Sequence, residues 1–98
     1  MSYNISNYTR TQARRLGVKV KPSTVKNKKI DVIYNGKKIA SVGDIRYKDY
    51  SIYLKESGKE VAERRRSAYR KRHAKDSKRQ PGGIEKQSRG YFARQLLW

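Results

Sequence analysis

The sequence predicts a small α+β domain, in which a β-hairpin packs against two or three helices and an extended basic arm precedes the domain. Two strand-like runs flank Asn35-Gly36, which predicts the hairpin. Residues 59–75 contain strong helix formers and neither Gly nor Pro, which predicts a helix. With 98 residues the chain has room for one domain at most. We expect this domain over residues 30–98 and the basic N-terminal arm over residues 1–29.

The first part of the arm contains the signals of a short helix. Thr9 or Thr11 is expected to cap this helix, because a threonine hydroxyl accepts a hydrogen bond from a free main-chain N–H. Gly17 is expected to end it in a left-handed conformation. Arg14 and Arg15 would then lie in the last turn, where positive charge suits the helix dipole.

The second part of the arm, residues 18–29, predicts an extended stretch. Valine and lysine alternate until Pro22, and proline is not expected in a central strand. Because successive side chains of an extended chain point to opposite sides, Lys19 and Lys21 should project to one side and the two valines to the other.

Residues 29–42 are the predicted hairpin. Asn-Gly favours a type I′ turn, because both turn positions need positive φ. A two-residue turn would place Tyr34 opposite Lys37, Val32 opposite Ile39, and Ile30 opposite Ser41. One face would carry Ile30, Val32, Tyr34 and Ile39, and the other Asp31, Ile33, Lys38, Ala40 and Val42. Since both faces are partly apolar, we expect something to cover each of them.

Helices are expected after the hairpin. Asp49 is expected to cap a short helix that Ser57-Gly58 ends. The basic helix covers residues 59–75, with acidic residues in its first turn and basic residues in its last. Residues 76–83 form a flexible connector rich in glycine. The C-terminal helix covers residues 88–98 and carries the densest apolar cluster of the chain.

The net charge restricts the class of function. The chain has 26 Lys and Arg against eight Asp and Glu, a formal charge of +18, whereas small domains ordinarily carry about 2 to 8 charges in magnitude. Such self-repulsion is tolerated when the partner is a polyanion, most commonly nucleic acid. The sequence has no cysteine, no apolar run of membrane-spanning length and no signal-peptide core. We therefore expect a protein made and kept inside a cell, or packed into a particle assembled there.

The positive charge gathers in the arm and in the basic helix, where two basic triplets spread charge almost all round the helix. Neutralising phosphates with these residues would release counterions and make binding steeply salt-dependent; a solvated charged face is the alternative. No motif for reading base sequence is present. The expected polyanion-binding residues are Lys19, Lys21, Lys26, Lys28, Lys29, Arg64, Arg65, Arg66, Arg70, Lys71 and Arg72.

Catalysis has little support in the sequence. The one histidine, His73, lies among basic residues, where a solvated helix position is a simpler interpretation than a general base. The carboxylates are scattered, and no phosphate-binding glycine loop, nucleophile elbow or metal-ligand spacing appears. We expect no enzyme activity, no catalytic residue, no cofactor and no metal.

Two groups of aromatic residues leave alternatives open. Tyr47, Tyr50 and Tyr53 could stack on single-stranded bases, or they could form core or interface. The C-terminal group either packs against the chain's own hairpin or docks into a neighbouring protein, where aromatic anchors dominate binding energy. As a protein interface it would comprise Tyr91, Phe92, Leu96, Leu97 and Trp98.

Three elements stand out over residues 30–98. The first is Gly43-Asp44, followed by Arg46-Tyr47 and Asp49-Tyr50. The second is the basic helix with Arg65, Tyr69, Arg72 and His73. The third is the closing motif, Gly90-Tyr91-Phe92-Ala93-Arg94-Gln95-Leu96-Leu97-Trp98. With these elements the chain resembles a family of short basic proteins of unknown function found in large double-stranded DNA viruses. The closing motif is the most specific of the three. The resemblance implies a viral protein carried in the particle and assigns no catalytic residues.

These observations together predict a non-enzymatic structural protein of a large DNA virus or phage particle. It would be a minor capsid or virion component that bridges acidic capsid surfaces or packaged DNA. The expected partners are the major capsid protein and nucleic acid bound without sequence specificity. Two alternatives stay open: a nucleoid-type nucleic-acid-binding protein free in the cell, and a ribosomal protein.

Overall fold

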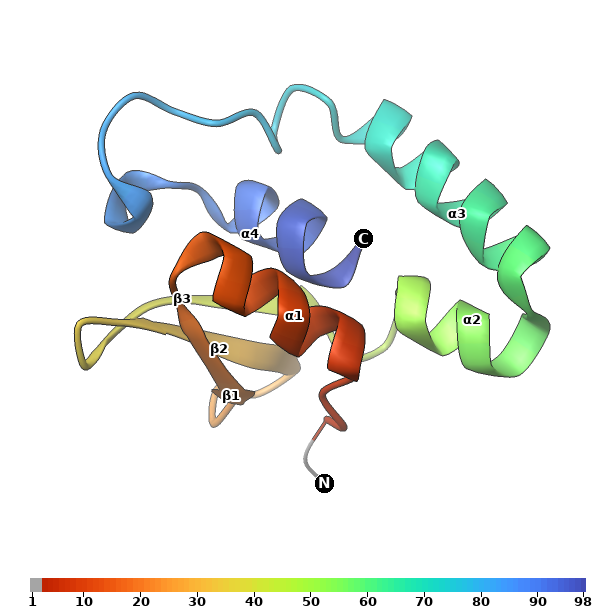
Figure 1. The fold of residues 1–98 in the computed structure, drawn as a ribbon, viewed down its shortest axis with the longest axis horizontal. Helices are drawn as coiled ribbons and strands as arrows, with labels where there is room; N and C mark the ends of the chain where they lie inside the picture. The colour runs from red at the N-terminus through yellow and green to blue at the C-terminus, as the bar shows by residue number, and fades with distance from the viewer. Residues whose placement is uncertain (1–2) are drawn as a thin grey trace.

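The computed structural model describes residues 3–98, and within them the fold is α+β, as predicted (Figure 1). Three strands of this part form one antiparallel sheet in the order β1-β2-β3. α1 and α4 pack against each other and against the sheet, while α2 and α3 form a helical hairpin beside them. The elements are α1 (Asn7–Leu16), β1 (Lys19–Pro22), β2 (Lys28–Tyr34), β3 (Lys37–Asp44), α2 (Tyr50–Ser57), α3 (Lys59–Arg72), the 3-10 helix η1 (Ile84–Lys86) and α4 (Arg89–Leu97).

The N-terminal helix forms, but neither predicted threonine caps it. α1 begins after Ser6, whose hydroxyl accepts a hydrogen bond from the Thr9 main-chain N–H at 3.2 Å. Thr9 is buried, and its Oγ1 donates to the main-chain oxygen of Leu96 at 2.7 Å. Gly17 ends the helix with a φ of 76°, as predicted. Thr9 thus ties the first helix to the last.

Residues 3–29 do not form the predicted extended arm, because they contribute to the core. β1 pairs antiparallel with β2 at the edge of the sheet, where Pro22 is tolerated. Ala13 of α1 and Val18, just before β1, are 3% and 6% exposed and join the central hydrophobic cluster. The alternation of lysine and valine was therefore the pattern of a paired strand, with its lysines facing solvent.

The hairpin turn has the predicted geometry. Asn35 and Gly36 connect β2 to β3 with φ values of 52° and 76°. Tyr34 lies opposite Lys37, as expected for a two-residue turn.

The register beyond the turn differs from the prediction. Val32 pairs with Ala40 and Ile30 pairs with Val42, so Ile39 is an extra residue on β3. Such a bulge shifts all later pairs by one position and turns the side chains to the other face. Val42 consequently joins Ile30 and Val32 on the buried face.

The carboxylates of Asp31 and Asp44 accept hydrogen bonds that stabilise the strands and the loops beside them. Burial raises the pKa of Asp31, but hydrogen bonds from the hydroxyls of Ser23 and Ser41, both 2.6 Å long, outweigh burial and leave the pKa below its ordinary value. Asp44, at the end of β3, accepts hydrogen bonds from the side chain and main chain of Arg46, which lower its pKa to about 2. Both groups therefore favour the fold when they are ionised.

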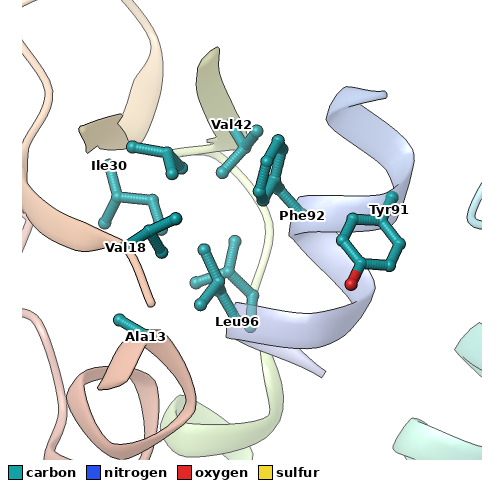
Figure 2. Close-up of a cluster of buried hydrophobic side chains, with 9 residues drawn as sticks. Ala13, Val18, Ile30, Val42, Tyr91, Phe92 and Leu96 are labelled. Atoms are coloured by element: carbon teal, nitrogen blue, oxygen red, sulfur yellow. The ribbon is translucent and has the colours of Figure 1, made fainter. Parts of the chain in front are cut away.

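The core lies between the sheet and the pair α1–α4 (Figure 2). Ile30, Val32 and Val42 come from the sheet, and Phe92 and Leu96 come from α4; each is at most 1% exposed. Burying one such side chain contributes about 1.5–3 kcal/mol relative to leaving it in water. α4 is therefore an integral part of the domain.

The helical hairpin begins and ends close to the predicted positions. Asp49 caps α2 by accepting a hydrogen bond from the Ile52 main-chain N–H at 3.1 Å, and Gly58, with a φ of 89°, separates α2 from α3. α3 ends at Arg72 rather than at residue 75. There the chain turns, and the carbonyl of His73 accepts hydrogen bonds from the main chain and hydroxyl of Ser77.

The last helix agrees with the prediction for residues 88–98. Ser88 caps α4 by accepting a hydrogen bond from the Tyr91 main-chain N–H at 3.0 Å. At the other end, Gln12 of α1 donates to the main-chain oxygen of Gln95 at 3.1 Å. Together with Thr9, this side chain satisfies carbonyl groups that have no partner within the helix.

Candidate functional site

The structure separates the two groups of predicted polyanion-binding residues. Lys19, Lys21 and Lys26 are exposed on β1 and the loop that follows it, and Lys28 is half-buried at the start of β2. The other group lies on α3, and Figure 1 shows β1 and α3 on opposite sides of the molecule. The two groups therefore belong to different surfaces.

Lys29 is a structural residue, which corrects its predicted role. It is only 2% exposed, and its Nζ lies 2.8 Å from Oδ2 of Asp49 in a buried ion pair. The same carboxylate oxygen accepts a hydrogen bond from the Tyr3 hydroxyl. Burial, followed by this contact with the carboxylate, raises the pKa of Tyr3. Lys29 thus joins β2 to the beginning of α2 and offers no charge to a partner.

Arg66 also stabilises the fold. Its guanidinium group binds the Glu63 carboxylate through two contacts of 2.7 and 2.8 Å and lies 4.0 Å from the ring centre of Tyr50. Tyr50 donates its hydroxyl to the same carboxylate at 2.7 Å, and this hydrogen bond raises the tyrosine's pKa. These contacts join α2 to α3. Of the other α3 residues predicted to bind a polyanion, Arg70 is half-buried, and the exposed ones are Arg64, Arg65, Lys71 and Arg72.

A cavity of about 370 Å³ lies where the end of α3, the connector after it and α4 meet. Its lining includes Arg70, Lys78, Arg79 and Arg94, and among the residues that the structure describes no carboxylate lines it. Arg79 is held in place by a 2.9 Å hydrogen bond to the Tyr91 hydroxyl. We call this cavity the arginine pocket.

The guanidinium group of Arg70 in the arginine pocket has only part of its hydrogen bonds satisfied. Its Nη2 donates to the main-chain oxygen of Trp98 at 3.1 Å, but its buried Nε has no hydrogen-bond partner within residues 3–98. Burial, and then the charges of Arg94 and Arg66, lower its pKa. An anion bound here would supply the negative charge that this group of cations lacks.

Sequence reasoning found Arg70 but missed the other cations of this pocket. Lys78 and Arg79 lie in the stretch that was predicted to be a flexible connector. Arg94 lies in a helix that was interpreted through its apolar residues alone. No local pattern joins these positions, because their proximity depends on how α4 packs; the one available signal was the place of Arg94 inside the closing motif.

A second cavity, of about 430 Å³, lies between α2, α3, α4 and the loop after β3. A row of aromatic rings lines it. Tyr69 stacks on Trp98 with ring centres 4.4 Å apart and planes at 9°, and on His73 at 4.3 Å and 29°. Tyr53 lies against Trp98 in a tilted arrangement at 6.2 Å. We call this cavity the aromatic pocket.

Tyr47, Tyr50 and Tyr53, which the sequence left as either base-stacking or core residues, lie in different environments. Tyr50 is buried between the helices. Tyr47 is 68% exposed and lines the aromatic pocket together with Tyr53. The core interpretation therefore holds for Tyr50. Tyr53 is half-buried against Trp98, and Tyr47 is the exposed ring of the three.

Of the two alternatives for the C-terminal aromatic group, the structure shows packing within the chain's own domain, so the interpretation as a protein interface is wrong for its buried residues. Tyr91, Phe92, Leu96 and Leu97 are at most 4% exposed and belong to the central hydrophobic cluster, into which Phe92 and Leu96 point in Figure 2. Trp98 is half-buried in the aromatic row. The hairpin and α1 present enough apolar surface to cover these side chains, so they are not available as anchors for a partner.

His73 faces a carboxylate as well as a ring. Its Nδ1 lies 3.0 Å from Oδ2 of Asp76, and this contact lowers the pKa of the aspartate.

In the part of the chain that the structure describes, His, Asp and Glu side chains form no group of three that could hold a metal ion. Within residues 3–98, no helix combines the length and the apolar character needed to cross a membrane.

Comparison with known proteins adds one match. Residues 18–53 match a family of unknown function (DUF5754). The matched range runs from β1 through the hairpin into α2 and includes Gly43-Asp44, Arg46-Tyr47 and Asp49-Tyr50; the closing motif lies outside it. No curated protein and no solved structure showed significant similarity to the chain.

Proposed function

We propose that this chain is a non-enzymatic nucleic-acid-binding protein that holds phosphate groups in the arginine pocket. The observation that carries the proposal is the convergence of Arg70, Arg79 and Arg94, from two helices and a connector, on one cavity whose described lining has no carboxylate. A guanidinium group presents five N–H donors in a rigid fork that matches a phosphate. Without an anion, these three groups repel one another; a phosphate removes that repulsion.

A polymer fits this surface better than a single small anion does. A further hollow shares Arg70 with the arginine pocket and continues along α3 past Ser67 and Lys71. Its one carboxylate, Glu63, is already bound by Arg66. The cationic surface therefore extends along α3, as expected for a site that follows a nucleic-acid backbone. Phosphate contacts of this kind fix the position of the chain and carry no sequence information.

The polyanion in this proposal is the packaged DNA of a large DNA virus, and the protein is a component of its particle. The resemblance of residues 30–98 to the viral family supports this setting. The C-terminal aromatic group no longer does, because it is buried in the domain's own core. Acidic capsid surfaces remain a second source of the same negative charge, so the major capsid protein is the competing partner.

The phosphate contacts are tested by binding to a duplex DNA over a range of salt concentrations, measured by fluorescence anisotropy. The double variant Arg79→Gln/Arg94→Gln removes two cations of the arginine pocket. The matched control, Lys37→Gln/Lys55→Gln, removes two exposed cations that do not line it. The slope of log K against log salt is negative, and each lost phosphate contact reduces its magnitude by about 0.9.

We expect the pocket variant to lose close to two such contacts and the control to keep the slope of the unmodified protein. Equal slopes for the two variants would mean that general charge, and not the arginine pocket, binds the DNA. Absence of any salt-dependent binding would refute the proposed function.

The particle setting needs its own experiment. Purified particles are washed at moderate salt, and the protein is quantified before and after opening the shell. Retention with the released DNA supports the DNA-bound component, and retention with empty shells assigns the counter-charge to capsid protein. Absence from washed particles would leave a binding protein free in the cell, and cosedimentation with ribosomes would favour the ribosomal alternative.

A further inference from the structure

We infer that the aromatic pocket binds an unpaired nucleobase, so that unpaired stretches of nucleic acid are bound more tightly than the duplex, which the arginine pocket contacts through its phosphates alone. This inference rests on the proposed function and adds to it the kind of strand that is bound. It starts from the rings of Tyr69 and Trp98, which are parallel within 9° and lie beside a cavity of about 430 Å³. Small-molecule sites in proteins have volumes of about 300–1,000 Å³.

The charged residues that line the aromatic pocket indicate the charge of the ligand that it binds. Three of its charged lining residues already have partners: Lys29 pairs with Asp49, Lys48 with Glu56, and Asp44 with Arg46. Arg65 and Arg72 also line the pocket, and neither forms an ion pair within the described residues 3–98.

The two free arginines lie on one face of α3, because residues seven apart are close to two full turns apart. Arg65 is placed over the ring of Tyr53, 5.3 Å from its centre. A ligand that suits this pocket therefore has a flat aromatic part and a negative charge next to it. A cationic ligand, which aromatic rings alone would favour, is repelled by these guanidinium groups.

A nucleotide within a strand has both of these parts. Its base presents a π-face to the row of rings, and its phosphate meets an arginine at the rim. In a duplex the base faces are stacked on one another and cannot enter. The exposed ring of Tyr47, at the mouth of the pocket, adds a further surface on which a base can lie.

Trp98 provides the measurement, because it is the only tryptophan of the chain. Its fluorescence is titrated with oligothymidylate, with an abasic strand of the same length, with a duplex and with thymidine monophosphate, all at one salt concentration. We expect saturable quenching by oligothymidylate and about tenfold weaker binding of the abasic strand, which has the same phosphates but no bases.

Two substitutions locate the effect. Tyr47→Leu removes an exposed ring and Tyr69→Leu removes the central ring of the row; each is expected to weaken oligothymidylate binding about tenfold and to leave duplex affinity unchanged. Tyr47→Phe keeps the ring and is expected to bind as the unmodified protein does. Because Tyr47 is 68% exposed, its variants report on binding even if Tyr69→Leu folds poorly.

Failure of this inference differs from failure of the proposed function. Equal affinity for oligothymidylate and the abasic strand, with duplex binding intact, would overturn the base site and leave phosphate binding in place. Thymidine monophosphate that binds as tightly as the strand would assign the pocket to free nucleotides and overturn strand binding. Unchanged oligothymidylate binding by Tyr47→Leu would also overturn the proposed base site.

Discussion

Replacing Lys29 by methionine tests whether its charge serves the fold or a ligand. The ammonium group lies 2.8 Å from Asp49, and the two side chains are 3% and 1% exposed. Lys29→Met would leave that carboxylate buried without its counter-ion, although Tyr3 and the N–H of Ile52 still donate to it. Breaking a buried pair from one side costs about 3–5 kcal/mol. Domains of this size have about 5–15 kcal/mol of stability in total.

Urea unfolding, followed by the fluorescence of Trp98, measures this loss. With a slope of about 1–3 kcal/mol per molar urea, the midpoint should fall by at least about 1 M. The control Lys26→Met removes the same charge from an exposed loop position and should change stability by no more than about 0.5 kcal/mol.

The double variant Lys29→Met/Asp49→Asn should recover part of the loss, because asparagine still caps α2 and carries no charge. The reasoning would be refuted if Lys29→Met were no less stable than Lys26→Met. It would also be refuted if folded Lys29→Met bound DNA more weakly than Lys26→Met, since Lys29 would then be the binding residue that the sequence predicted.

Two further outcomes concern the backbone and the carboxylates. Thermal melts should show Gly90→Ala less stable than Gly36→Ala, because a Cβ at Gly90 would lie 2.1 Å from the Asp76 main-chain oxygen, whereas one at Gly36 meets nothing within 4 Å and adds only the strain of a side chain at a φ of 76°. Acid should destabilise the protein as the pH falls from about 4 toward about 2, since the lowered pKa values of Asp31 and Asp44 make the folded chain resist protons that the unfolded chain binds. A melting temperature constant between pH 5 and 2 would contradict this.

The turn and most helix ends could be predicted from the sequence because they depend on neighbouring residues. Asn35-Gly36 adopts positive φ whatever packs on the hairpin. Asp49 reaches an N–H three residues further along the chain, and Gly17 ends α1 by its own conformation. Each of these signals is complete within a few residues.

The bulge and the first strand could not be predicted in the same way. The extra residue at Ile39 places Val42 in the core and Ser41 beside Asp31, a gain that exists only once the helices cover the sheet. Val18 likewise becomes a core residue only because α1 and α4 complete the cluster that it joins. In the sequence this stretch is a lysine-rich run that ends at Pro22, which is also the pattern of an unpaired arm.

The positions of the free positive charges in the candidate site likewise could not be predicted from the sequence. Composition predicts an anionic partner, but the fold decides which cations are left unpaired for it. Within residues 3–98, six of the 26 lysines and arginines pair with a carboxylate. These pairs hold Lys29 and Arg66 inside the structure, while Arg70 and Arg94 are placed together without a carboxylate. Because the few carboxylates pair within the chain and the arginines of the arginine pocket have none beside them, this distribution of charge supports the proposal that a partner supplies the negative charge.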